Sequence, residues 1–462
     1  MAKKRRPVQP VRTKADPDRA SAGDARDGSA VVAAICLAAV LAATALAVDT
    51  SAAASFDAPK RLAALLGAAV AAAVAFLWPL RRVREDDART ILGRGVRRAA
   101  AILAAAALGA SLVSALASPR RGIALDALRA EALLALFLLL GASRAGRFRG
   151  LLVGSFLAAS AINAAVAVLE SRDLFHPFQL ETFGSRQDTG AFAGNVGYLA
   201  IALAFASVLA LGVALEHPVR RTRILAGACL PLFAAALVVN QNLTALTALL
   251  VGAAVLLALR FRSRAILPMV AAAVLVAGAV AAYQPLRARA AELGRAARAG
   301  DWDTVLSFRG GPWAAAIEMA RERPLVGYGP GTFAAEYVPH RLAAEIRAKR
   351  RFLTPLLTSS YAEAHSDYLQ LFSDVGAPGA LCAIGAAAAL LFAIGRRAAR
   401  ERLPEAVVLT ALLATGAAAA LTWFPLQRPV TAVPLLLAAG RAWRVAGDGD
   451  DPAGSRGPET ES

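Results

Sequence analysis

The stretch SAVVAAICLAAVLAATALAV, residues 29–48, decides the fold class. It has the length of the roughly 20 apolar residues that a helix needs to cross the hydrocarbon core of a membrane. It is also too long for the apolar region of a signal peptide. Similar runs rich in Ala, Leu and Val recur along the chain, and 57% of the 462 residues are hydrophobic. A soluble domain has only about 45–50% apolar residues, so we expect an all-α, polytopic integral membrane protein.

The apolar runs predict about twelve transmembrane helices. They divide the chain into a disordered basic tail at 1–28, nine spans within 29–284, a large loop at 285–375, three spans within 376–445 and a disordered tail at 446–462. We expect the spans near residues 29–48, 62–80, 99–117, 125–142, 150–170, 190–215, 223–240, 243–259, 265–284, 376–395, 404–423 and 429–445.

Arginine is unevenly distributed among the loops between these runs. Every second short loop is basic, as in 81–98 and 143–149, and the loops between them are poor in Arg and Lys. The positive-inside rule therefore predicts that both termini are cytoplasmic and that the large loop faces the outer side. The same loops and tails account for the formal net charge of +18. Lipids are thus the expected partners, and nucleic acid is not.

The cysteines do not indicate a metal or disulfide site. Cys36, Cys229 and Cys382 all lie within apolar runs, and no CxxC motif occurs. A disulfide framework or a zinc site is therefore not predicted. No acidic cluster is arranged to hold a metal ion, so we expect neither a metal nor a cofactor.

The large loop 285–375 is the first place to look for chemistry. A connection of this length usually carries a function, and the pieces 312–322 and 340–350 are helix-like. The loop contains two of the four histidines, His340 and His365. Histidine is the side chain best suited to accept a proton near neutral pH.

Other candidate residues lie on the same predicted side of the membrane. They are Arg309, in the motif RGGPW, the glycine-rich stretch 327–333, Arg186 in an outer loop, and Asn195 just inside the span that follows. Arginine neutralises phosphate through paired hydrogen bonds. Arginines and one histidine would suit a phosphate leaving group and a hydroxyl nucleophile.

Several of these residues form a pattern that resembles the O-antigen ligase and polymerase superfamily. His365 and Ser366, followed after nine residues by Gly376 and then by Gly379, are similar to its His-[Asn/Ser/Gln]-x9-Gly-x-x-Gly signature. The pair Arg309-x-x-x-Trp313 and the run from Pro324 to Phe333, PLVGYGPGTF, also resemble family motifs. Arg186 before the span that contains Asn195 matches a further one. The resemblance covers most of the chain from about residue 170 onward.

The resemblance implies a bacterial inner-membrane glycosyltransferase whose active site faces the periplasm. It would move a glycan from undecaprenyl diphosphate to a hydroxyl of the lipid A-core, with inversion and without a metal or ATP. It implies that His365 accepts the proton of the acceptor and that Arg309 and Arg186 bind the diphosphate. Arg321 is a second choice, because Arg321-x-x-x-Leu325 also fits an Arg-x3-Leu pattern, and Asn195 is a further substrate-binding candidate.

One position departs from the family. Relatives often carry Ser-Arg-Gly at the start of the span after the seventh, where this chain has Asn242-Leu243-Thr244 and no Arg. The alternatives are an O-antigen or exopolysaccharide polymerase of the same superfamily, whose acceptor is a glycan, and a transporter of lipid-linked sugars. A transporter would place polar residues at mid-membrane. It is disfavoured because the centres of the predicted spans are nearly all Ala, Leu, Val and Gly, with Arg129 and Glu131 as the main exception.

Overall fold

The chain is helical throughout the part that can be described. The computed structural model describes residues 17–52, 54–77, 95–178, 189–267, 269–270, 278, 281–352 and 361–447, with the backbone alone for 17–27. No β-strand occurs among these residues. The all-α fold class predicted from the sequence is therefore confirmed.

Eight helices in the described part are long and apolar enough to cross a membrane. This identifies the chain as a membrane protein with several spans, as its composition predicts. The eight segments are Gly28–Leu46, Asp57–Phe76, Val96–Ala117, Arg149–Glu170, Val196–Glu216, Arg220–Asn240, Leu243–Ala265 and Asp367–Glu401.

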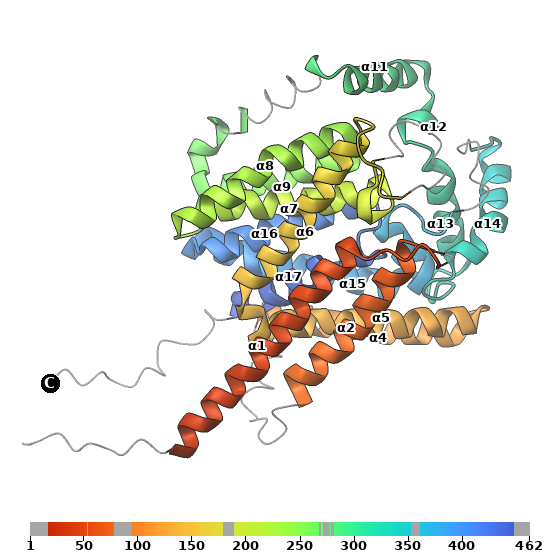
Figure 1. Cartoon of the computed structure of the whole chain (residues 1–462). Helices are drawn as coiled ribbons and strands as arrows, with labels where there is room; N and C mark the ends of the chain where they lie inside the picture. The colour runs from red at the N-terminus through yellow and green to blue at the C-terminus, as the bar shows by residue number, and fades with distance from the viewer. Residues whose placement is uncertain are drawn as a thin grey trace, which may run out of the picture.

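The helices form a bundle with a smaller group at one end (Figure 1). The small group consists of α11 (Gln284–Ala299), α12 (Trp302–Val305), α13 (Gly310–Glu322) and α14 (Phe333–Ala348). The bundle consists of α1 (Pro17–Leu46), α2 (Asp57–Ala72), η1 (Ala73–Leu77), α4 (Val96–Ala117), α5 (Arg121–Ala142), η2 (Arg144–Arg147), α6 (Arg149–Glu170), η4 (Ala191–Ala193), α7 (Val196–Glu216), α8 (Arg220–Asn240), α9 (Leu243–Phe261), η5 (Arg262–Ala265), α15 (Asp367–Glu401), α16 (Pro404–Ala420) and α17 (Pro429–Gly447).

Four of the predicted spans do not correspond to one of the eight apolar helices. The predicted spans 125–142 and 429–445 are helices α5 and α17, which carry charged residues within them. The predicted span 404–423 is the shorter helix α16. The predicted span 265–284 falls largely outside the described residues. The exact number of spans therefore stays a prediction.

Two predicted boundaries differ from the structure. Helix α1 begins at Pro17, inside the region 1–28 that we expected to be a disordered tail. Proline is favoured in the first turn of a helix, so Pro17 suits that start. At the other boundary α15 begins at Asp367, before the end of the predicted loop 285–375. The helix-like pieces predicted within that loop are confirmed by α13 and α14.

Helix α7 lies at the centre of the bundle. Fifteen of its 21 residues are buried, and it packs against α6, α8, α9 and α16. Its apolar residues cover the whole circumference of the helix, as expected for a helix surrounded by others. The start of α7 is therefore a fixed point at the end of the bundle.

Helices α5 and α17 approach each other at backbone distance. A Cβ atom on Gly141 would lie 2.2 Å from the Leu437 oxygen, and one on Gly440 would lie 1.9 Å from the Leu138 oxygen. Small residues at such crossings are typical of membrane helices, where close packing replaces the hydrophobic effect. This contact fixes α17 and, with it, the loop that leads into α17.

Helix α15 contains a break at Gly376. The backbone there has φ 71° and ψ 173°, outside the helical region. The break follows from the sequence, because Gly376 adopts positive φ without steric cost and Pro378 cannot donate a helical hydrogen bond. The segment before the break, with His365 just ahead of it, is thus set at its own angle to the rest of α15.

The glycine-rich stretch between α13 and α14 packs into this break. The amides of Tyr328 and Gly329 donate to the carbonyls of Ser373 and Asp374, both at 2.9 Å. A Cβ on Gly327 would lie 2.4 Å from the Asp374 oxygen, and Gly327 itself has φ +65°. The two glycine motifs of the sequence are therefore one structural contact, which joins the small group of helices to the bundle.

Gly327→Ala is expected to destabilise the protein. The left-handed backbone conformation alone costs an Ala about 1–2 kcal/mol, and the clash with the Asp374 carbonyl adds to that. The measurement is thermal unfolding of the purified protein in detergent. Gly294→Ala on α11 is the control, because a Cβ there meets nothing within 4 Å. Equal melting temperatures for the two variants would contradict the close packing at Gly327.

Candidate functional site

Two loops meet at the end of the bundle and form the floor of the site. One precedes α15, and the other joins α16 to α17. The Asp367 amide donates to the Trp423 carbonyl at 3.1 Å, and the Leu426 amide donates to Asp367 Oδ2 at 3.0 Å. The Ser366 hydroxyl donates to the Ala420 carbonyl at 3.3 Å. These bonds hold the entry of α15 against the second loop.

His365 lies at this junction in an unusual backbone conformation. Its φ of +56° is rare for a residue with a side chain and is maintained only by its surroundings. Its ring contacts Tyr361, Trp423 and Phe424 edge to face, with centroid distances of 5.1, 5.4 and 4.9 Å. Trp313 Nε1 donates to its carbonyl at 3.3 Å. The ring is thus held by aromatic groups and remains partly exposed.

The hydrogen bond of the His365 ring fixes its tautomer. Nδ1 lies 3.1 Å from the Glu363 carbonyl oxygen, which can only accept. Nδ1 must therefore carry the proton, and Nε2 keeps its lone pair. The pKa of His365 is lowered to about 4, mainly by burial and also by the charges of Arg309 and Arg428. The hydrogen bond to the Glu363 carbonyl has the opposite effect and raises the pKa. The imidazole is therefore neutral near pH 7.

Arg309, another residue singled out by the sequence analysis, lies near this ring. It precedes the first turn of α13, and its guanidinium carbon is 5.5 Å from the centroid of the Trp423 ring. The Tyr361 hydroxyl donates at 3.2 Å to the carbonyl of Phe308, the residue before Arg309. Arg309 and His365 therefore share two neighbours, Trp423 and Tyr361.

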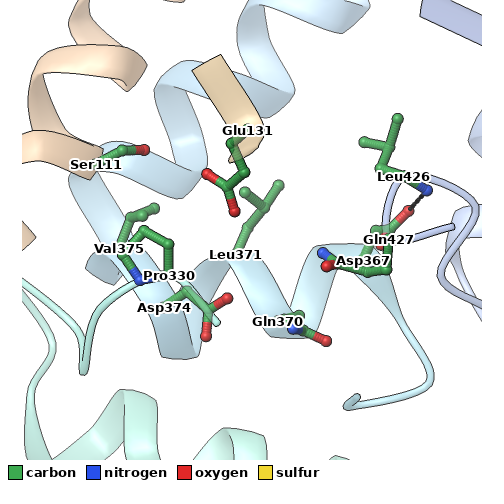
Figure 2. Close-up of a pocket in the computed structure, with 10 residues that line it drawn as sticks. All are labelled: Ser111, Glu131, Pro330, Asp367, Gln370, Leu371, Asp374, Val375, Leu426 and Gln427. Atoms are coloured by element: carbon green, nitrogen blue, oxygen red, sulfur yellow. Dashed lines mark hydrogen bonds between the residues drawn. The ribbon is translucent and has the colours of Figure 1, made fainter. Parts of the chain in front are cut away.

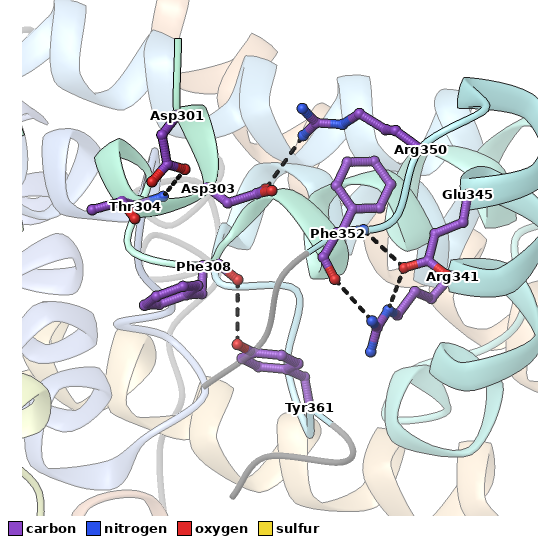
Figure 3. A network of polar contacts seen from close by, with 9 residues as sticks. All are labelled: Asp301, Asp303, Thr304, Phe308, Arg341, Glu345, Arg350, Phe352 and Tyr361. Carbon is purple, nitrogen blue, oxygen red and sulfur yellow. Dashed lines mark hydrogen bonds and ion pairs between the residues drawn. The ribbon is translucent and has the colours of Figure 1, made fainter. Parts of the chain in front are cut away.

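A polar network supports the loop that carries Arg309 (Figure 3). The Arg350–Asp303 ion pair, at 3.3 Å, joins the end of α14 to α12. Arg341 pairs with Glu345 at 3.1 Å and donates to the Phe352 carbonyl at 2.9 Å. These contacts join α12, which lies just before Arg309 in the chain, to α14 and the segment after it.

The other predicted arginines are not placed at this site. Arg321 is exposed at the far end of α13, where it pairs with Glu318 at 3.6 Å. Twelve helical residues separate it from Arg309, which corresponds to about 18 Å. Arg186 lies outside the described residues. A role for either residue in binding substrate stays a prediction.

Asn195, which was predicted to bind substrate, has a structural role at the start of α7. It is the N-cap residue of α7, and its Oδ1 accepts from the amides of Gly197 at 2.8 Å and Tyr198 at 3.4 Å. The start of α7 borders the site, because a Cβ on Gly197 would lie 2.1 Å from the Trp423 ring. Substrate binding by Asn195 stays a prediction.

Sequence reasoning missed a second cation at the site, Arg428. It ends the loop between α16 and α17, and its side chain is only 11% exposed. It forms ion pairs with Glu363 and, at 3.0 Å, with Asp57. An arginine in a predicted outer connection departs from the positive-inside pattern, and that departure is the signal that could have revealed it.

A small polar cavity lies beside the first turns of α15 (Figure 2). Three carboxyl groups contribute to its lining, those of Glu131, Asp367 and Asp374. Among the described residues no group of three or more His, Cys, Asp or Glu is arranged to hold a metal ion. The cavity brings polar groups of α5 and α15 together, and of its three carboxyl groups the sequence analysis singled out Glu131.

The comparison with protein families bears on the same segment of the chain. Residues 227–384 match the family model described as O-antigen ligase. This segment of the chain is therefore an O-antigen ligase-like domain. The resemblance drawn from the His365 motif is thus confirmed, and the domain includes both Arg309 and His365. The function is therefore of the O-antigen ligase or polymerase type. No curated protein matches the chain significantly.

In this domain Asn242 and Thr244 lie where the related sequences often carry Ser-Arg-Gly. Asn242 caps a helix, and Thr244 contacts another loop. Asn242 Oδ1 accepts from the Ala245 amide at 3.0 Å and caps α9. The Thr244 and Thr422 hydroxyls are 3.0 Å apart. Thr244 thus attaches the start of α9 to the loop that carries Trp423.

Asn195→Ala is expected to lower the free energy of unfolding by about 1 kcal/mol, because the cap of α7 is lost. Asn195→Asp keeps an acceptor for the two amides and should retain both stability and glycan transfer. Thermal unfolding and the glycan products in cells are the measurements. A stable but inactive Asn195→Asp protein would show instead that the amide group contacts the substrate.

Proposed function

We propose that this O-antigen ligase domain transfers a glycan from undecaprenyl diphosphate to a sugar hydroxyl of the lipid A-core, at the periplasmic face of the bacterial inner membrane. His365 is the base, and Arg309 binds the diphosphate. Arg186 is a second diphosphate contact, proposed from the family resemblance alone.

The reaction is a single displacement at the anomeric carbon. The acceptor oxygen attacks this carbon while its proton passes to His365 Nε2. The bond between the anomeric carbon and the phosphate oxygen breaks, and its electron pair leaves with the diphosphate. The guanidinium of Arg309 stabilises the charge that develops there, an electrostatic effect that is strongest where water is excluded. Attack opposite the leaving group inverts the anomeric configuration.

The observation that carries this proposal is the state of His365. Its Nδ1–H donates to the Glu363 carbonyl, so its Nε2 has a lone pair, and the low pKa keeps the ring neutral. A base must be unprotonated before it can act. The strained backbone at His365 supports the same role, because strain of this kind is concentrated at functional sites.

His365→Ala is expected to reduce glycan transfer by about 10²- to 10⁴-fold, the usual contribution of a general base. The measurement is the lipopolysaccharide ladder of a deletion strain that expresses the variant at the wild-type level. His176→Ala is the matched control, because that histidine is exposed and pairs with the exposed Asp173. A normal ladder with His365→Ala would remove His365 from the mechanism.

The deletion strain itself distinguishes the finer functions. Loss of all O-antigen bands with accumulation of lipid-linked polymer indicates a ligase. Core that carries a single repeat unit indicates a polymerase. An unchanged ladder would contradict a role in O-antigen assembly and would favour another surface glycan or a transport function.

Arg309→Lys is expected to lower kcat/KM by about tenfold or more, because the planar fork that binds two phosphate oxygens is lost. The assay uses the purified protein with a lipid-linked glycan donor. Arg347→Lys on α14 is the matched control, because that exposed arginine pairs with Glu318, and it should leave the rate unchanged. The assignment of the diphosphate to Arg309 is wrong if the two variants are equally active.

A further inference from the structure

Arg428 connects three separate parts of the chain near His365. Its guanidinium pairs with Asp57 at the start of α2 and with Glu363 in the loop before α15. It also lies over two aromatic rings, at 4.8 Å from the Tyr198 centroid and 5.6 Å from that of Phe424. The Arg428 side chain is therefore fixed on several sides.

These contacts make Arg428 unsuited to hold a phosphate. Both terminal nitrogens already bind carboxylates, so its charge is compensated within the protein. A buried arginine that lost one of these partners would be costly.

Glu363 is the link between Arg428 and His365. Its side chain, in a residue only 8% exposed, pairs with Arg428, and its carbonyl accepts the His365 Nδ1–H at 3.1 Å. The side chain and the carbonyl belong to one residue, so the ion pair restrains the direction of the carbonyl. An imidazole is oriented by the group that binds its other nitrogen.

We propose that the Asp57–Arg428–Glu363 ion-pair chain is a positioning device for His365, which fixes the Nδ1–H tautomer and directs Nε2 toward the acceptor hydroxyl. The proposal rests on the proposed function of His365 as base. Arg428 and Glu363 are positioning residues in it, because they act through His365 and not on the substrate.

The charges around His365 predict the direction in which its pKa should change in each variant. The titratable and charged groups near the ring are Tyr361 and Glu363 from its own loop, Arg309 at the start of α13, and Arg428. A nearby cation disfavours the imidazolium. Removal of Arg428 should therefore raise the pKa of His365, whereas removal of the Glu363 carboxylate should lower it or leave it unchanged.

The experiment titrates His365 directly, without reference to catalysis. The chain has only four histidines, so histidine-selective ¹⁵N NMR of the protein in lipid nanodiscs resolves few signals. The His365 signals are assigned by their loss in His365→Gln. The ¹⁵N shifts report both the pKa and which ring nitrogen carries the proton.

Wild-type His365 should be neutral and protonated at Nδ1 near pH 7. Arg428→Gln should raise its pKa, because a nearby cation is removed, and should mix the two tautomers. Glu363→Gln should mix the tautomers without raising the pKa. Arg428→Lys keeps the positive charge, so His365 should retain its low pKa while both tautomers become populated. This variant also provides a test if Arg428→Gln does not fold.

Arg441→Gln is the matched control. It breaks the pair of Arg441 with Glu405, which is similarly shielded at 17% and 20% exposure and lies toward the other end of α17. This variant should not change the His365 signals. Transfer assays should show a lower kcat with little change in KM for Arg428→Gln and wild-type kinetics for Arg441→Gln.

Two results would overturn the proposal. One is an unchanged His365 tautomer and pKa in both Arg428→Gln and Glu363→Gln. The other is a pKa shift of the same sign in both variants, which would indicate general loosening of the loop. Failure of the proposed function is a separate result, because normal transfer by His365→Ala would contradict the base assignment whatever the NMR shows.

Discussion

The packing of the glycine-rich stretch into the break of α15 is the constraint on which the site depends. It is a contact of backbone against backbone, since Gly327 and Gly376 each lie within van der Waals distance of the main chain of the other segment. The break separates the first turns of α15 from the long spanning part. It also attaches α13 to the bundle, so that His365 and Arg309 approach each other from different helices.

The glycine and histidine parts of the signature consequently have different physical roles. Gly327 and Gly376 supply conformations and close approaches that other residues would not allow. His365 and Arg309 supply the groups that can exchange a proton or bind an anion. The spacing between His365 and Gly376 is the length of the first, separately oriented segment of α15.

Aromatic rings determine the electrostatics of the site. Tyr361, Trp423 and Phe424 pack against the His365 ring, and this burial disfavours its charged form. The cations near it are held differently. Arg428 is compensated by carboxylates, and Arg309 lies over Trp423 beside the base. A neutral base next to a cation suits a reaction in which a proton is accepted while negative charge develops on a leaving group.

The sequence by itself determined the fold class and most of the helix positions, and it singled out two residues, His365 and Arg309, that the structure brings near each other. Apolar runs of span length can be read locally, because the membrane requires each helix to bury its own backbone. His365 and Arg309 were predicted because each lies in a short motif.

Only the tertiary structure decided which residues share the site. Arg428 and Asp57 are far from His365 in the chain, and nothing local in the sequence pairs them. Arg321 fitted a local pattern as well as Arg309 did, but the length of α13 places it at the other end of the helix. Asn195 was selected as a polar residue at a span, and the geometry of α7 shows that its oxygen caps the helix. A motif consists of residues that are close together in the sequence. A site is formed where separate helices meet, and where they meet depends on packing across the whole bundle.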